Sequence, residues 1–252
     1  MMTSHGEHSA TTELGRWLLS SRLAQVGELV AVFVVALAAI AIGTVVTGGS
    51  SNPLLYQAVV WVANVLMLLT VWLGLRLRGQ TWEHFGLRFG GVSPRGIVKT
   101  VLLSVAVFVA AVTAFIVGAS VMANIVDQPQ PADMSGYNYL HGNLPLTLLA
   151  LAAIYIVASF GEEVIYRAFL INRIAELGAG GKLAWAVALI ISSIVFGLVH
   201  FTWGVTGMVQ TGCMGLALGV CYLSVKRNLW VTILAHGYMD TLLVLQMYAA
   251  EA

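Results

Sequence analysis

Long stretches without charged residues constrain this chain most strongly. Residues 29–47, 54–75, 100–126, 144–161 and 183–225 contain no Asp, Glu, Lys or Arg, and residues 229–248 contain only Asp240. A transmembrane helix needs about 20 predominantly apolar residues. Charged residues make up 9% of the chain, whereas an average soluble domain has roughly 25%. We therefore predict an integral membrane protein that is surrounded by a lipid bilayer.

The predicted fold is all-α, a polytopic bundle of about seven transmembrane helices. The stretch 183–225 is too long for one span, so we expect a break near Trp203 and Gly204. The expected organisation is given by four ranges: a cytoplasmic tail at 1–25, three N-terminal transmembrane helices within 26–126, an interfacial cytoplasmic segment at 76–96, and a four-helix core at 144–248.

The basic residues predict the orientation of this bundle. With seven spans, all 12 Lys and Arg residues fall on one side or at its margin, whereas the opposite loops carry Asp127 and Asp133. Because Lys and Arg concentrate in cytoplasmic loops, we expect a cytoplasmic N-terminus and a C-terminus outside. In a bacterial cell this membrane would be the plasma membrane. Topology accounts for the basic residues, and nothing indicates nucleic-acid binding.

Three polar motifs interrupt the apolar helices of the second half: EEVIYR at 162–167, FGLVH at 196–200 and HGYMD at 236–240. Ionisable side chains inside a bilayer cost several kcal/mol unless they face one another or a water-filled cavity. This cost makes them candidates for a functional site. The ionisable members are Glu162, Glu163, Arg167, His200, His236 and Asp240.

Helical spacing predicts how these residues meet. Glu163 and Arg167 are i,i+4 neighbours and can pair, which leaves Glu162, turned about 100° away, free to point elsewhere. Phe196 should share a helix face with His200, as His236 should with Asp240. At about 1.5 Å per residue, the helix lengths place the three motifs at one depth, in the cytoplasmic half of the membrane.

A free carboxylate beside two imidazoles is suited to activating water. Glu162 could act as general base, His200 could position the water, and His236 with Asp240 could stabilise an oxyanion. Alternatively, His200, His236 and a carboxylate such as Asp240 could bind zinc, with water as the fourth ligand. In another interpretation Glu162, His200 and His236 form a proton relay or ion site of a transporter or a non-enzymatic membrane protein.

The motifs EExxxR, FxxxH and HxxxN/D, in this order on consecutive hydrophobic helices, resemble the CPBP intramembrane protease family. This family includes CAAX prenyl endopeptidases, bacteriocin-processing enzymes and abortive-infection proteins. The resemblance covers roughly residues 144–248. It implies an intramembrane endopeptidase, either glutamate-type or zinc-dependent, with a polar cavity open to the cytoplasm and a membrane-associated or lipidated peptide as its substrate.

The resemblance also implies a role for each matching residue. Family roles make Glu162 the catalytic base, Glu163 and Arg167 its supporting pair, and His200 the partner that orients water. His236 and Asp240 become the oxyanion-binding or metal-binding pair, and Phe196 belongs to the supporting motif of His200. Asp240 stands where the family more commonly has an amide. A carboxylate donates a hydrogen bond only when it is protonated, so this position bears on the choice between the two roles.

Overall fold

The computed structural model describes residues 12–91 and 93–250, and within these residues every regular element is helical. The all-α prediction is therefore confirmed for this part of the chain. Residues 1–11 of the predicted cytoplasmic tail lie outside the described residues. The remainder of that tail forms a short helix, α1 (Glu13–Ser20), and the next helix already begins at Arg22.

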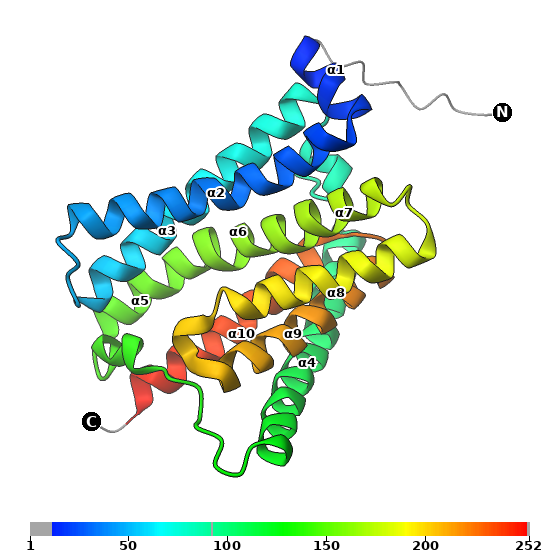
Figure 1. The fold of residues 1–252 in the computed structure, drawn as a ribbon. Helices are drawn as coiled ribbons and strands as arrows, with labels where there is room; N and C mark the ends of the chain where they lie inside the picture. Colours follow the sequence, from blue (N-terminus) through cyan, green and yellow to red (C-terminus); the bar gives the residue numbers. More distant parts are fainter. Residues whose placement is uncertain (1–11, 92, 251–252) are drawn as a thin grey trace.

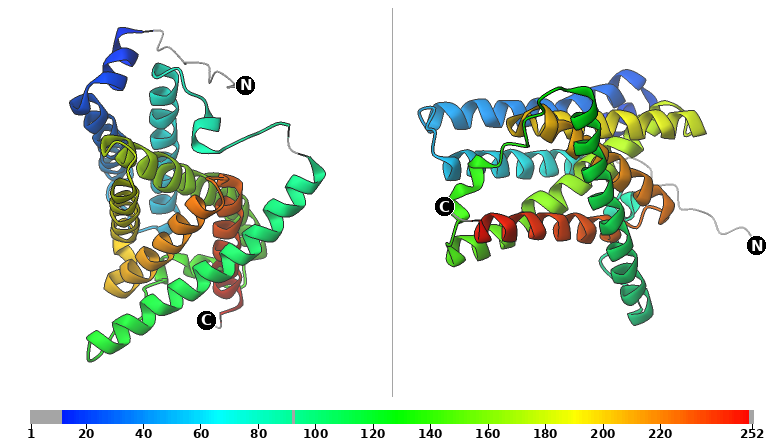
Figure 2. Two further views of the ribbon diagram at one scale, coloured as in Figure 1. Left: turned by 90° about the vertical axis from the view of Figure 1, so that its right-hand side faces the viewer. Right: turned by 90° about the horizontal axis from the view of Figure 1, so that it is seen from below.

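Two long antiparallel helices form the N-terminal part, α2 (Arg22–Val46) and α3 (Pro53–Leu77), and they pack along each other (Figure 1). The Asn52 side chain caps α3 by accepting a hydrogen bond from the Leu54 amide, and Pro53 occupies the first turn. These are preferred residues for a helix start. A long helix, α4 (Pro94–Ile125), then runs at a steep angle to the other helices and packs against the last two helices of the chain (Figure 2).

The segment between α3 and α4, which is predicted to be interfacial, is anchored in the protein by two of its apolar side chains. Its 3₁₀ turn η1 (Trp82–Phe85) inserts into the protein, and Phe85 and Leu87 are fully buried. The Phe85 ring meets Phe169 edge-on with 6.5 Å between ring centroids, and the Tyr222 hydroxyl donates to the Phe85 carbonyl oxygen. These two side chains therefore join the protein core, and the interfacial position of the segment stays a prediction.

A single continuous helical rod carries the first polar motif. It begins at α5 (Leu144–Ala153) and ends at α7 (Ile171–Leu177). Between these lie the π-helical stretch η3 (Ile154–Ser159), the short α6 (Phe160–Glu162) and the second π-helical stretch η4 (Glu163–Leu170). π-helical turns are rare and frequently occur at functional sites. Here they flank Glu162 on both sides.

The 3₁₀ turn η2 (Ser135–Leu140) precedes the rod. After the rod, the described part of the chain ends in three helices: α8 (Lys182–Leu198), α9 (Gly204–Ser224) and α10 (Leu229–Ala249). The turn η5 (Phe201–Trp203) separates α8 from α9. The predicted break near Trp203 and Gly204 is thus confirmed. Gly204 has φ +74°, a left-handed conformation that glycine adopts without strain.

Within the part of the chain that the structure describes, five helical segments are long and apolar enough to cross a membrane: Arg22–Val46, Pro53–Leu77, Pro94–Ile125, Leu144–Leu177 and Phe201–Ser224. The helix α8 is apolar but has only 17 residues. The helix α10 has 21 residues but is not among the five segments. Its residues His236 and Asp240 lower its hydropathy, because ionisable groups transfer poorly into lipid. The count of seven spans therefore stays a prediction.

The helix ends gather at two opposite ends of the molecule. In Figure 1 the turn between α7 and α8 lies at the right, whereas the turn between α2 and α3 and the C-terminal end of α10 lie at the left. The right-hand end, which we call the basic end, carries the Lys and Arg residues near the helix termini: Arg76, Arg78, Arg173, Lys182, Lys226 and Arg227. The sequence-based grouping of basic residues on one side agrees with this arrangement.

Candidate active site

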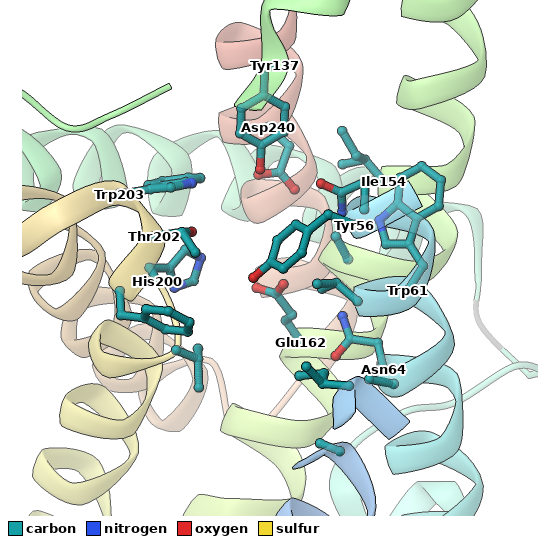
Figure 3. Close-up of a pocket in the computed structure, with 18 of the residues that line it drawn as sticks. Tyr56, Trp61, Asn64, Tyr137, Ile154, Glu162, His200, Thr202, Trp203 and Asp240 are labelled. Atoms are coloured by element: carbon teal, nitrogen blue, oxygen red, sulfur yellow. The ribbon is translucent and has the colours of Figure 1, made fainter. Parts of the chain in front are cut away.

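The four predicted catalytic residues line one cavity of about 450 Å³. Glu162 comes from the rod, His200 from the turn after α8, and His236 and Asp240 from α10. In Figure 3 the Glu162 carboxylate and the His200 ring face each other across this cavity, with Asp240 further along it (Figure 3). The structure therefore brings together three motifs that are separated in the sequence by about one helix each.

The predicted pair of Glu163 and Arg167 is present and completely buried. Arg167 Nη1 lies 3.2 Å from Glu163 Oε1, and their side chains are 1% and 0% exposed. The guanidinium carbon of Arg167 sits 4.0 Å from the centroid of the Phe196 ring, a favourable cation–π arrangement. Phe196 thereby connects the ion pair of the first motif to the helix that carries the second.

Glu163 has a second partner that the sequence spacing did not indicate. Its Oε1 lies 3.0 Å from His236 Nδ1. Because an ionised carboxylate only accepts hydrogen bonds, the Nδ1–H of His236 is the donor. The ring is thereby turned so that Nε2 faces the cavity, 3.9 Å from Glu162 Oε2 and 3.7 Å from Asp240 Oδ1.

Asp240 is held by a residue outside the three motifs. The Ser159 hydroxyl, on the first π-helical stretch, donates to Asp240 Oδ2 at 2.7 Å. The remaining oxygen, Oδ1, is the one nearer to His236. Ser159 is buried in a run of apolar and small residues, and no local spacing rule links it to α10.

The spacing predicted that His200 and Phe196 share one face of a helix. In the structure His200 lies beyond the end of the helix that carries Phe196, although the two rings remain in contact. The helix α8 ends at Leu198, and His200 belongs to the following turn. Its Nδ1 lies 2.7 Å from the Phe196 carbonyl oxygen, which can only accept a hydrogen bond. Nδ1 therefore carries the proton, and in the neutral ring Nε2 keeps a free lone pair.

Aromatic rings fix the plane of the His200 imidazole. The centroids of Phe196 and Trp203 each lie 4.9 Å from that of His200, both in edge-to-face geometry. Such contacts are typical preferred arrangements of aromatic pairs. The helix end supplies the freed carbonyl group that hydrogen-bonds Nδ1, so the break in α8 is part of what orients the ring.

The wall opposite His200 is formed by α3, which carries a row of polar residues at helical spacing: Gln57, Trp61 and Asn64. The Trp61 Nε1–H is buried and has no hydrogen-bond partner among the described residues. An indole N–H is a donor only. This wall lies outside the three motifs, and the sequence analysis did not single it out.

Tyr137 closes the cavity near Asp240 (Figure 3). Its burial, together with the negative charges of Asp240 and Glu162, raises the pKa of the Tyr137 phenol. Burial disfavours the charged phenolate, and so do neighbouring carboxylates. The phenol therefore keeps its proton and remains a hydrogen-bond donor.

The described residues contain no group of three or more His, Cys, Asp or Glu side chains placed to hold a metal ion. In particular, His200 binds a backbone carbonyl through Nδ1 and stands across the cavity from Glu162. The donor set of His200, His236 and Asp240 is not assembled for the tetrahedral geometry that zinc prefers. We therefore derive no reaction step through a metal.

The part of the chain that carries the site matches a known protein family. Residues 144–242 match the family model described as type II CAAX prenyl endopeptidase Rce1-like. The resemblance to the CPBP family is confirmed for this segment. No curated protein and no solved structure gives a significant match. The match covers less than half of the chain, and the apolar helices indicate an integral membrane protein.

Proposed function

We propose that the protein is an intramembrane endopeptidase that hydrolyses a peptide bond of a membrane-associated or lipidated polypeptide. One observation carries this proposal most directly: the Glu162 carboxylate and the free Nε2 of His200 face one cavity from opposite sides. Glu162 is 17% exposed, whereas Glu163, Arg167 and His236 are at most 4% exposed and engaged with one another. One carboxylate is available for chemistry while its neighbour is occupied.

In the proposed reaction, water lies between Glu162 and His200. Glu162 takes one proton from the water, and the Nε2 lone pair of His200 accepts a hydrogen bond from the other O–H and so orients it. The water oxygen bonds to the carbonyl carbon, and the carbonyl electron pair moves to its oxygen. Glu162 then delivers its proton to the leaving nitrogen as the C–N bond breaks, which yields a carboxylic acid and an amine.

His236 is the proposed donor to the oxyanion. Glu163 holds its Nδ1–H, so an imidazolium at this position would direct Nε2–H into the cavity. An ionised Asp240 cannot donate to an oxyanion, but its Oδ1, 3.7 Å from His236 Nε2, would attract the positive ring. In this assignment Asp240 supports His236, and Tyr137 offers an additional neutral donor nearby.

The cavity wall indicates the kind of peptide that fits. Among the described residues its acidic members are Glu162 and Asp240, and it has no Lys or Arg. The other walls are largely apolar and aromatic, and α3 adds the neutral donors Trp61 and Asn64. A free C-terminal carboxylate would meet these two carboxylates and no Lys or Arg, and the His236 ring is already engaged by Glu163 and lies near Asp240. An internal, neutral or basic segment would not be repelled.

Cleavage-site proteomics tests this function. Membranes from cells that produce the wild-type protein should contain new peptide termini, and these should be missing from cells that produce Glu162→Gln at the same abundance. Glu176→Gln is a matched control, because it makes the same chemical change in the same helical rod, outside the cavity. Identical peptide termini in the wild-type and Glu162→Gln membranes would contradict the proposal.

A further inference from the structure

The cavity and the basic residues lie at opposite ends of the molecule. From Glu162 the cavity extends toward the start of α3, the turn η2, the turn η5 and the last part of α10. All of these segments lie at the end that is remote from the α7–α8 turn. The residues that line this outer part of the cavity are Tyr56, Gln57, Tyr137, Tyr139, Thr202 and Leu243.

The opposite direction, from Glu162 to the basic end, is filled by packed core. The rod residues that follow the catalytic position, among them Ile165, Ala168 and Phe169, are completely buried. Phe85 and Leu87 of the η1 segment pack against the same core with no exposed surface. Close-packed interiors leave few voids larger than a water molecule. A peptide therefore has no path to Glu162 from the basic end in this structure.

Charge decides which end faces the cytoplasm. The loops 47–52, 126–143 and 199–204, at the end where the cavity lies, contain no Lys or Arg. The basic end has eleven of the 12 basic residues on or near its helix termini, Arg167 being the exception inside the site. By the positive-inside rule the basic end is cytoplasmic. This arrangement favours a cavity that opens away from the cytoplasm, in contrast to what the family resemblance implies.

We propose that the active site opens to the extracytoplasmic side of the membrane and that its substrate is a membrane-anchored polypeptide whose cleavage site lies on that side. That the substrate is a polypeptide rests on the proposed function. Tyr56, Tyr137 and Trp203 around the outer part of the cavity are residues enriched at membrane–water interfaces.

The anchor of such a substrate has an apolar place to lie. Leu37 on α2, Leu198 at the end of α8 and Phe201 in η5 border the cavity, and they are 67%, 58% and 64% exposed. These side chains are therefore on the outer surface of the bundle, where lipid surrounds it. A polypeptide held in the bilayer could reach Glu162 from this flank without its anchor leaving the membrane.

Labelling of introduced cysteines in oriented membrane vesicles tests the inference. In a background with Cys213→Ala and Cys221→Ala, Asn138→Cys and Thr202→Cys place thiols beside and inside the outer cavity, and Lys99→Cys places one at the basic end; all three positions are exposed. A membrane-impermeant maleimide should label the first two in right-side-out vesicles and not in intact inside-out vesicles. Lys99→Cys should show the reverse pattern.

A second measurement ties the labelled end to the site. A bulky impermeant maleimide on Thr202→Cys should block cleavage in right-side-out vesicles, whereas the same reagent on Asn138→Cys should leave more activity. Labelling of Asn138→Cys and Thr202→Cys in inside-out vesicles only would overturn the inference. Full cleavage after complete modification of Thr202→Cys would also overturn it. The labelling pattern gives the orientation whether or not cleavage occurs, so full cleavage by Glu162→Gln would count against the proposed function alone.

Discussion

Two clusters of polar and ionisable side chains lie along the same helical rod, and they differ in what their charged atoms face. The cluster at the basic end joins α2, α3, η1 and α7, and it consists of Glu28, Arg78, Gln80, His84, Arg173 and Glu176. Arg78 Nε donates to Glu28 Oε2 at 2.9 Å, and Arg173 donates to Glu176 at 2.9 Å. These groups mainly satisfy one another.

The site cluster also contains Glu, Arg and His side chains. Two of its members, Glu162 and His200, direct an oxygen or a nitrogen into the cavity. Glu162 has His236 as a neighbour at 3.9 Å, beyond hydrogen-bond distance, and His200 uses only Nδ1 within the protein. A charged group in apolar surroundings is structural when its partners saturate it. It becomes a candidate for catalysis when an oxygen or nitrogen remains directed into a cavity.

The largest expected effect comes from breaking the buried pair beneath the site. Arg167→Ala leaves Glu163 buried beside His236 without its main cation, which costs about 3–5 kcal/mol of stability. We expect low abundance in membranes and a clearly lower unfolding temperature of the detergent-purified protein. A wild-type unfolding temperature for Arg167→Ala would show that the pair does not support the fold, and Arg95→Ala at the exposed end of α4 is the matched control.

His200 should act on rate rather than on folding. His200→Ala removes the proposed acceptor that orients water, so we expect kcat to fall by about 10²–10³, comparable to the loss of a group that stabilises the transition state. Its hydrogen bond to the Phe196 carbonyl is one neutral contact worth about 1 kcal/mol, so abundance should remain near wild type. Wild-type kcat in this variant would remove His200 from the mechanism.

Asp240 distinguishes the two chemistries that the motif leaves open. In the metal-free mechanism, Asp240→Asn keeps an oxygen that can accept from Ser159 but removes the negative charge that attracts the His236 ring, so the cleavage rate should fall while the zinc content does not change. If Asp240 were a zinc ligand, the neutral amide would bind the metal less well. Cleavage rate and zinc content should be measured on the same purified samples, and a parallel loss of both would support the metal-dependent alternative.

The smallest effect is expected at the basic end. Glu176 pairs with Arg173 and His84, but its side chain is 36% exposed, and exposed ion pairs typically contribute about 0–1 kcal/mol. Glu176→Gln should therefore shift the unfolding temperature slightly and leave the cleavage rate unchanged. A strong loss of cleavage at normal abundance would mean that the two clusters are coupled, and the contrast drawn between them would fail.

Several parts of the fold could be predicted from local sequence. Hydropathy indicated the helices, Gly204 marked the break after α8, and i,i+4 spacing indicated the pair of Glu163 with Arg167. Each of these depends on residues that are close in the chain. The meeting of Glu162, His200 and His236 followed from helix lengths alone.

Other features depend on packing between distant segments. The π-helical turns beside Glu162 have no residue signature in an apolar run, and the bonds of Glu163 to His236 and of Ser159 to Asp240 join residues 73 and 81 positions apart. The helix end before His200 was hidden by the apolar residues Val199 and Phe201. The direction in which the cavity extends depends on which half of the bundle packs tightly, and a run of apolar residues does not show how tightly it packs.

The most direct test of the central claim compares Glu162→Gln with the wild-type protein on a substrate identified by proteomics. Gln keeps the size of the side chain but cannot take a proton from water. Loss of a general base costs roughly 10²–10⁴ in rate, so we predict that loss of kcat with unchanged abundance and unfolding temperature. Full activity of the purified Glu162→Gln protein would contradict the account.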